Sequence, residues 1–459
     1  MKHLQNTAVV LSLLTVVAVA HDHHGAHHHK RQGPGNGGPV VVAGTITVPP
    51  LASITFGMPT APIPPSTATA TPGAIPPFKG APPLPNPAWA FTPGEWPEMD
   101  KPIDATTPQV QEWMKELEGW DIPDIKPTVD GSCVNDTAAA ADAAARGWWT
   151  CGGYTRATDI VDCPDKMTWG VSFDDGPAEY STHLLEYLAS TKPNPTLATF
   201  FVVGSRVIGS PGLLINEYMA GHEISIHTWS HPHLTALTTP QIVAELGWTR
   251  KAIQSVLGVT PTTMRPPYGD IDDRVRAIAL AMGMIPVIWT RVPNAAAPGG
   301  GFSFDTFDWM VAGGLVKGQD SFATFGSILG NASTLDTGFC VLQHDLYEIT
   351  VDLAIGYTLE AAMSHQPAFK LEPIGQCAKI PTNNMYRESN TNQTFPYKSP
   401  PAGLSASGNS GNKSTSGNGK VAQSGNGGNG TTGTSGAIGR SVGLVVVGMA
   451  VGAVGAMTI

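Results

Sequence analysis

The stretch WGVSFDDGP, residues 169–177, combines an apolar run with two aspartates and a turn. The apolar run, residues 169–173, predicts a strand. Successive side chains of a strand point to opposite faces, so Asp174 and Asp175 can serve one site only where the chain leaves the strand. Gly176 and Pro177 supply that turn. Two carboxylates this close repel each other, which raises the pKa of one unless a cation is present. A solvated pair of loop aspartates is the alternative.

The sequence around this stretch predicts a βα protein. Strands are expected at residues 169–173, 198–203, 223–226, 264, 285–289 and 338–342, and helices at 182–189, 213–220, 240–257, 272–282, 306–315 and 349–366. Repeated βα units predict a parallel sheet that is either closed into a barrel or open and doubly wound. In both folds the chemistry takes place at the carboxyl ends of the strands.

A second polar cluster, HTWSHP at residues 227–232, follows the strand expected at 223–226. Two imidazoles and a carboxylate make a three-ligand set that leaves open positions for water and substrate, which is typical of catalytic metal sites. Asp175, His227 and His231 fit that set, with zinc as the default ion and other divalent ions possible. Two surface histidines without a metal are the alternative.

Three further clusters also follow expected strands or the loops after them: RPPYG at 265–269, DTFDW at 305–309 and LQHD at 342–345. The two prolines fix the backbone and remove two donors, so the amide of Tyr268 is the next one free to point at a ligand. A single histidine such as His344 is usually structural. All five clusters nevertheless fall where a βα fold places its active site.

The ordered set FDDGP, HTWSHP, RPPYG, DTFDW and LQHD resembles the five motifs of the NodB-type polysaccharide deacetylases, carbohydrate esterase family 4. The resemblance covers about residues 163–377. It implies an α/β fold, a distorted (β/α) barrel usually of seven strands. Together with the two tails described below, the chain is similar to fungal cell-wall chitin deacetylases. That likeness implies hydrolysis of the N-acetyl groups of chitin to chitosan and acetate, with one divalent metal ion, zinc or cobalt.

The resemblance also implies catalytic roles. Asp174 would be the general base, and His344 the general acid with Asp345 tuning it. Arg265 would hold Asp174 in place, and Asp308 would hold Arg265. The metal ligands would be Asp175, His227 and His231.

It further implies a substrate pocket. The backbone amide of Tyr268 would donate to the oxyanion, and Trp309 and Leu342 would wall the pocket for the acetyl methyl group. The motifs define the chemistry and not the sugar, so xylan and peptidoglycan remain alternative substrates. A non-catalytic wall mannoprotein is the alternative from another class.

Both ends of the chain carry targeting signals. Residues 1–20 have a basic start, an apolar run and the cleavage pattern Ala18-Val19-Ala20, which predicts a secretory signal peptide. Residues 438–459 end in an apolar run after a tract of small residues, which predicts a GPI-attachment signal. We prefer Asn429 as the attachment site over Asn426 and Ser435. A C-terminal membrane helix is the alternative. The expected location is the plasma membrane and cell wall.

The remaining segments are expected to differ in order. Residues 21–100 are His-rich and then rich in Pro, Thr and Ala, and we expect a linker. Its part from residue 33 to residue 100 is expected to be extended, because it cannot bury enough apolar surface to fold. Residues 101–162 predict a structured extension with helices at 108–120 and 138–146. Residues 163–380 form the expected catalytic domain, and 381–437 a low-complexity linker.

Charge, cysteines and sequons complete the expectations. The net charge of −10 argues against nucleic-acid binding, because no basic stripe is available for phosphates. A monomer is expected. The five cysteines of a secreted chain predict Cys163–Cys377 and Cys133–Cys151 disulfides and a buried free thiol at Cys340. Glycans are expected at the sequons Asn135, Asn331, Asn392 and Asn412.

Overall fold

The computed structural model describes residues 40–43, 46–293, 301–401 and 404. Its centre is a parallel sheet in the order β10-β3-β4-β5-β6-β7, with β11 paired to the first half of β3. The strands are β3 (Thr168–Asp174), β4 (Thr199–Val202), β5 (Glu223–Ile226), β6 (Thr263–Met264), β7 (Ile285–Pro286), β10 (Phe339–Cys340) and β11 (Lys370–Pro373). β3 is buried along its whole length, as expected for a parallel strand covered on both faces.

The sheet curls until its two edges meet. Just beyond β7, the amide of Thr290 donates to the carbonyl of Cys340 in β10 at 3.0 Å, and the amide of Cys340 donates to the hydroxyl of Thr290 at 2.9 Å. The predicted distorted (β/α) barrel is therefore confirmed.

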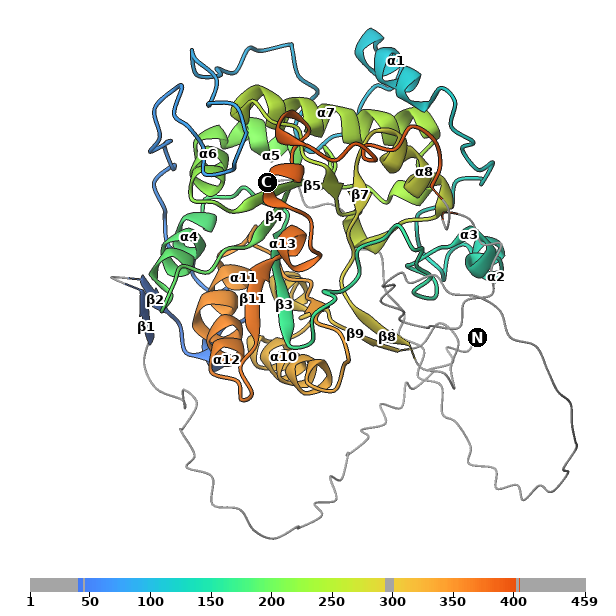
Figure 1. The fold of residues 1–459 in the computed structure, drawn as a ribbon. Coiled ribbons are helices and arrows are strands. Elements are labelled where there is room, and N and C mark those ends of the chain that lie inside the picture. Colours follow the sequence, from blue (N-terminus) through green and yellow to red (C-terminus); the bar gives the residue numbers. More distant parts are fainter. Residues whose placement is uncertain (1–39, 44–45, 294–300, 402–403, 405–459) are drawn as a thin grey trace, which may run out of the picture.

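Helices surround this barrel (Figure 1). Those that follow the first strands are α4 (Ser181–Ser190), α5 (Gly204–Gly209), α6 (Pro211–Met219), α7 (Thr239–Leu257) and α8 (Asp273–Ala281). Those nearer the C-terminus are α9 (Asp308–Ala312), α10 (Gly318–Ala332), α11 (Glu348–Leu353), a π-helical turn (Ala354–Thr358), α12 (Leu359–Met363) and α13 (Ile374–Cys377). The long helix α7 begins with a capping box between Thr238 and Gln241 and ends at Gly258, which has a φ of 79°.

Several elements differ from the sequence-based prediction. The sequence did not predict the helices α5 and α10 or the strand β11. It also did not predict the antiparallel pair of β8 (Arg291–Pro293) and β9 (Gly301–Ser303). α10 has the sequence GQDSFATFGSILGNA, which is rich in small and polar residues. Its buried apolar residues, Phe325, Ile328 and Leu329, are too few to give a clear helical periodicity. The predicted helix at 108–120 is α1 (Pro108–Met114) followed by a 3₁₀ turn (Lys115–Leu117), and the one at 138–146 is split into α2 (Thr137–Ala141) and α3 (Ala143–Arg146).

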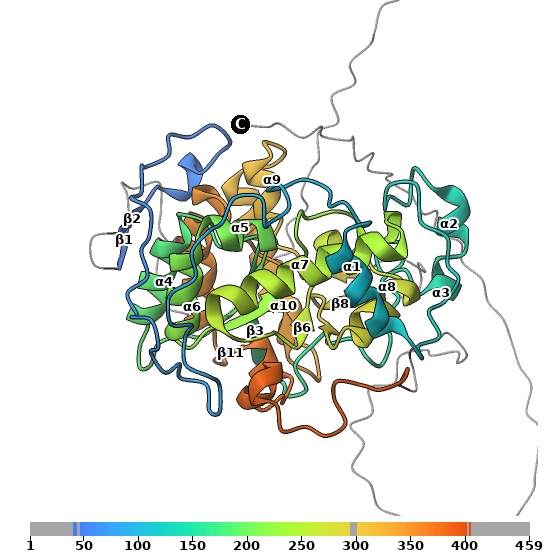
Figure 2. The same ribbon diagram turned by 90° about the horizontal axis from the view of Figure 1, so that it is seen from above.

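Residues 46–107, here called the N-terminal strap, lie on the barrel and its helices (Figure 2). The strap contains β2 (Ile46–Val48), which pairs with β1 (Val40–Ala43), and the short 3₁₀ helix Leu51–Ser53. Val48 and Ile54 are completely buried, and the ring of Phe78 stacks on Tyr218 of α6 at 4.9 Å. The prediction that residues 33–100 cannot bury enough apolar surface to pack is wrong from Ile46 onward.

The residues of the strap are not equally costly to order, which is why it packs despite its composition. Proline has little conformational freedom in the unfolded chain, so fixing a Pro-rich segment loses less entropy than fixing a Gly-rich one. A few large apolar side chains spaced along such a segment are then enough to hold it on the barrel.

At the other end, the packed chain continues past the predicted domain boundary at residue 380. Two short 3₁₀ helices, Thr382–Asn384 and Arg387–Ser389, follow, and Met385, Tyr386 and Leu404 are buried. The packed chain therefore extends beyond residue 380, at least to Leu404. Several predictions concern residues that the structure does not describe. They are the signal peptide, the GPI signal, the sequon at Asn412 and the candidate anchor sites Asn426, Asn429 and Ser435. Asn135 and Asn392 are exposed and Asn331 is partly exposed, and their glycosylation stays a prediction.

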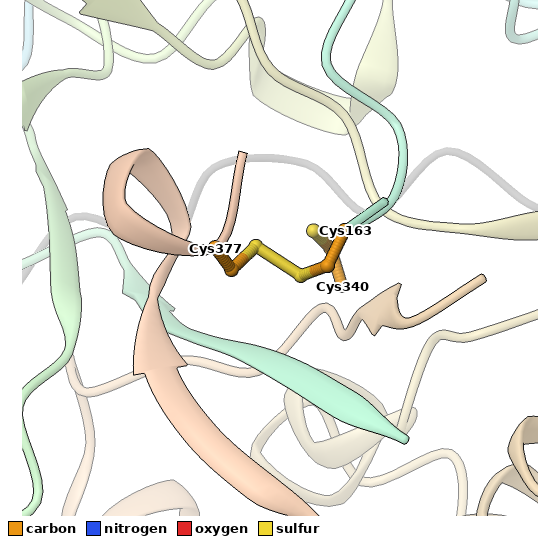
Figure 3. A group of neighbouring side chains, drawn as sticks. All are labelled: Cys163, Cys340 and Cys377. Atoms are coloured by element: carbon orange, nitrogen blue, oxygen red, sulfur yellow. A yellow bond between two sulfur atoms is a disulfide. The ribbon is translucent and has the colours of Figure 1, made fainter. Parts of the chain in front are cut away.

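The structure pairs the cysteines as the sequence predicts. Cys133 is bonded to Cys151 and Cys163 to Cys377, and Cys340 is a buried free thiol. The sulfur atom of Cys340 lies beside the Cys163–Cys377 bond, with all three sulfur atoms within 4.8 Å of one another (Figure 3). Gly170 of β3 passes this group so closely that a Cβ there would lie 2.9 Å from the sulfur of Cys377.

The part of the chain that the structure describes contains no helix with the length and apolar character needed to cross a bilayer.

Candidate active site

The polar clusters meet at the carboxyl ends of the strands. Asp174 is the last residue of β3, His227 directly follows β5, and Arg265 directly follows β6. The loop after β10 lies against the end of β3, because the amide of Asp174 donates to the carbonyl of Gln343 at 3.0 Å. This pairing brings His344, the next residue, beside Asp174.

The side chains of Asp175, His227 and His231 converge on one point. Nε2 of His231 lies 3.1 Å from Oδ1 of Asp175, and Nε2 of His227 lies 3.5 Å from the same oxygen. The three candidate ligand atoms are within 4.8 Å of one another. Asp175 reaches this position through a left-handed backbone conformation, with a φ of 82°, which turns it away from the strand direction of Asp174.

The arrangement fits a divalent cation. Oδ1 of Asp175 is buried and makes no hydrogen bond within the described residues. Both imidazoles have their other nitrogen occupied, since Nδ1 of His227 lies 2.8 Å from the carbonyl of Arg265 and Nδ1 of His231 lies 3.1 Å from the hydroxyl of Tyr268. Such partners orient a ligating histidine and leave Nε2 free for a metal.

The charges in this group are coupled. Burial acts to raise the pKa of the Asp175 carboxyl, but the imidazoles of His231 and His227 hold it well below its usual range. Burial lowers the pKa of His231. Both shifts favour an ionised carboxylate and a neutral imidazole, which are the forms that bind metals.

Asp174 lies next to the three candidate metal ligands but is not one of them. Arg265 is completely buried, and its Nη1 donates to Oδ1 of Asp174 at 2.6 Å and to the hydroxyl of Ser172 at 2.9 Å. Oδ2 of Asp174 lies 3.9 Å from Nε2 of His227. Arg265 thus holds Asp174 as the resemblance implied, with one carboxylate oxygen facing the metal group.

His344 and Asp308 form a second imidazole–carboxylate contact. Nδ1 of His344 lies 2.7 Å from Oδ1 of Asp308, and the amide of His344 donates to Oδ2 of the same carboxylate at 2.8 Å. Burial acts to lower the pKa of His344, but Asp308, with Asp175 and Asp174, raises it to about 10. His344 is therefore protonated at neutral pH.

This pairing corrects the expected role of Asp308, which holds His344 and not Arg265. Asp308 is the first residue of α9 and follows Phe307, whose left-handed conformation (φ of 56°) ends the preceding strand-like segment. That turn directs the Asp308 carboxylate toward the loop after β10.

Asp345 also differs from expectation, because its contacts are with the turn after Asp175 and not with the ring of His344. Its carboxylate accepts hydrogen bonds from the amide of Gly176 at 3.1 Å and from the hydroxyl of Ser181. Burial raises the pKa of Asp345 to about 7. Asp345 therefore ties the DDGP turn to the loop that carries His344.

The three predicted substrate residues lie around these groups. Tyr268 is 49% exposed and has a φ of 60°, and its ring stacks on His233 at 3.9 Å and meets His231 edge-on at 4.6 Å. Trp309 is 39% exposed, and its indole N–H lies 3.4 Å from Asp305. Leu342 is nearly buried. Tyr268 is thus on the metal side, whereas Trp309 and Leu342 are next to the His344–Asp308 pair.

Two residues that support the backbone around the proposed metal ligands, Glu245 and Arg206, were not predicted from the sequence. Glu245 of α7 accepts from the amides of Trp229 and Ser230, both at 2.8 Å, and from the hydroxyl of Ser230 at 2.7 Å. Burial raises its pKa to about 7. Arg206 of α5 donates to the carbonyl of Asp175 at 2.7 Å. An acidic residue among the apolar positions of a predicted helix was the available signal for Glu245.

Comparisons with known proteins show similarity to polysaccharide deacetylases. A family model described as "Polysaccharide deacetylase" matches residues 162–287. The chain is 47% identical over 349 residues to "Chitin deacetylase 1" of Cryptococcus neoformans var. grubii serotype A, covering 76% of this chain and 72% of that protein. It is 35% identical over 285 residues to "Chitin deacetylase 2" of the same organism, covering 59% of this chain and 56% of that protein.

Among solved structures, the chain is similar to that of the chitin deacetylase from the fungal pathogen Colletotrichum lindemuthianum. The sequence identity is 22% and the TM-score is 0.43, with 52% of this chain and 99% of that chain covered.

Proposed function

Because this chain belongs to the polysaccharide deacetylase family, we propose that it hydrolyses the N-acetyl groups of chitin with the help of one bound divalent metal ion. The observation that carries the proposal is the convergence of Asp175, His227 and His231 on one point, with Asp174 beside it. The relatives' names support chitin as the polymer.

Asp175, His227 and His231 would hold zinc or cobalt, and such an ion would supply a lowered pKa for a water ligand and polarisation of an acetyl carbonyl. Asp174 accepts the proton of the attacking water, since its Oδ2 faces the metal group while Arg265 holds its Oδ1. A well-placed general base of this kind contributes roughly 10²–10⁴-fold to the rate.

His344 supplies the proton that the departing amine needs. Its Nδ1 is engaged by Asp308, so Nε2 is the nitrogen free to donate. The raised pKa of His344 keeps that proton in place at neutral pH. The ring of Trp309 and the side chain of Leu342 border this side and suit the methyl group of an acetyl. The Tyr268 amide is the proposed oxyanion donor on the metal side.

Acetate release tests the proposal. The full chain is incubated with chitin oligomers and, separately, with acetylated xylan and with peptidoglycan. The expected result is acetate from chitin oligomers, lost with a chelator and recovered with zinc or cobalt. Faster release from xylan or peptidoglycan would change the substrate, and no release from any polymer would favour a non-catalytic wall protein.

The location is proposed from the sequence. The N-terminal signal and the C-terminal tail support an enzyme that is secreted and held at the plasma membrane and cell wall by a GPI lipid on Asn429. Treatment of intact cells with a phosphatidylinositol-specific phospholipase is expected to release the protein. Retention of the enzyme on treated cells would contradict the lipid anchor.

A further inference from the structure

The loop that carries two of the proposed metal ligands has an unfavourable backbone. Thr228 and His231 have φ values of 65° and 59°, although neither is glycine. Residues without a special reason rarely adopt the left-handed region, and they stay there only where neighbouring groups hold them. The ligand geometry of this loop therefore depends on what surrounds it.

The N-terminal strap contacts the centre of this loop. The indole of Trp229 is completely buried, and its N–H donates to the carbonyl of Glu98 at 3.1 Å. The ring of Trp96 stacks on that indole with a centroid distance of 6.2 Å and an interplanar angle of 3°. Two residues of the strap thus cover the side chain that lies between the two ligating histidines.

The strap also reaches the third ligand. Asp100 accepts a hydrogen bond from the hydroxyl of Ser205 at 3.0 Å and lies 3.7 Å from Nε of Arg206. The same Arg206 donates through Nη1 to the carbonyl of Asp175 at 2.7 Å. A chain of polar contacts therefore runs from Asp100 through α5 to the backbone of Asp175.

We propose that residues 96–100 of the strap are a positioning element of the metal centre. Trp96 and Glu98 hold the histidine loop through Trp229, and Asp100 holds Asp175 through Arg206. This inference rests on the proposed metal-dependent function. It makes the strap, which lies outside the matched family region of residues 162–287, a part of the catalytic unit.

Zinc affinity of the full chain, measured by competition with a chromophoric chelator, tests the proposal. Trp96→Ala is expected to weaken zinc binding about 10–100-fold, the range seen when groups that orient metal ligands are removed. Trp96→Phe, which keeps a stacking ring, is expected to restore most of the affinity. Asp100→Ala, a change at a half-exposed side chain, is expected to weaken binding by a few-fold.

Asn216→Ala is the matched control. Asn216 of α6 binds the strap at Ser66, Thr67 and Thr69, far along the strap from residues 96–100. The control is expected to lower the melting temperature and to leave zinc affinity unchanged.

The outcomes separate the two proposals. A wild-type chain that binds no zinc and releases no acetate removes the proposed function. A wild-type chain that does both, with Trp96→Ala and Asp100→Ala binding zinc as tightly as Asn216→Ala, overturns the positioning role and leaves the function standing. Loss of affinity in Trp96→Ala and Asp100→Ala, but not in the control, supports it.

Discussion

The two halves of the site use the same two chemical groups in opposite ways. On the metal side, His231 and His227 face the carboxylate of Asp175 through Nε2, and their Nδ1 atoms are held by neutral oxygens. On the acid side, His344 faces the carboxylate of Asp308 through Nδ1. Burial lowers the pKa of His231, whereas Asp308 helps raise that of His344 to about 10.

The difference shows that the orientation of an imidazole decides its function. A histidine whose Nδ1 donates to a neutral oxygen keeps a lone pair on Nε2 for a cation. A histidine whose Nδ1 meets a buried carboxylate keeps both protons and can give one away. In the proposed function, the same pair of groups thus serves as a metal ligand in one place and as a general acid in the other.

Removing a ligand from the metal side is expected to have the largest effect. His227→Ala takes away one of the three proposed ligands, so the proposed metal assistance would be lost. Since metal assistance is worth several kcal/mol, we expect acetate release to fall about 10³-fold or more. Steady-state acetate release with added zinc measures this, and near-wild-type rates would remove His227 from the ligand set.

Removing the acid is expected to have a somewhat smaller effect. His344→Ala leaves the ligands untouched, so zinc should still bind while kcat falls about 10²–10⁴-fold. The measurement pairs kcat with zinc content. Loss of zinc in this variant would show that zinc binding depends on His344.

Changing the partner of the acid is expected to shift a pKa. Because the folded-state pKa of His344 is raised to about 10, its proton is present at neutral pH and is lost as the pH rises through about 10. The alkaline limb of kcat/KM should therefore lie near pH 10 in the wild type. Asp308→Asn removes a cause of the shift and should move that limb toward neutral pH. A limb that stays in place would exclude Asp308 from this role.

A buried carboxyl outside both halves is expected to affect stability alone. Glu223, at the far end of β5 from His227, accepts from Thr199, Gly375 and Gln376, and burial raises its pKa to about 7. The folded state then binds more protons than the unfolded state between about pH 4.5 and 7, so stability should fall as the pH rises through this window, by on the order of 1–3 kcal/mol.

Glu223→Gln should flatten that dependence without altering the alkaline limb of kcat/KM. Urea unfolding at pH 5 and pH 8 measures the effect. An equal loss of stability in wild type and variant would assign it to other groups.

The sequence predicted the parts of the site that follow from motifs at the ends of parallel strands. Each motif is a strand end with its own turn, so the convergence of Asp175 with His227 and His231 followed from the parallel topology. The partner of Asp308 could not be predicted, because it depends on how the start of α9 approaches the loop after β10. The strap was missed for a similar reason, since Trp96 becomes a packing residue only when Trp229 and Trp248 are beside it.

The proposed site binds the cation through Asp175, His227 and His231 and keeps the transferable proton on His344. Equilibrium dialysis against zinc, followed by metal analysis of wild type, Asp175→Asn and Asp308→Asn, separates these two roles. We predict tight zinc binding at one site per chain in wild type and in Asp308→Asn, and its loss in Asp175→Asn. Zinc retained in Asp175→Asn, or lost equally in both variants, would contradict the account.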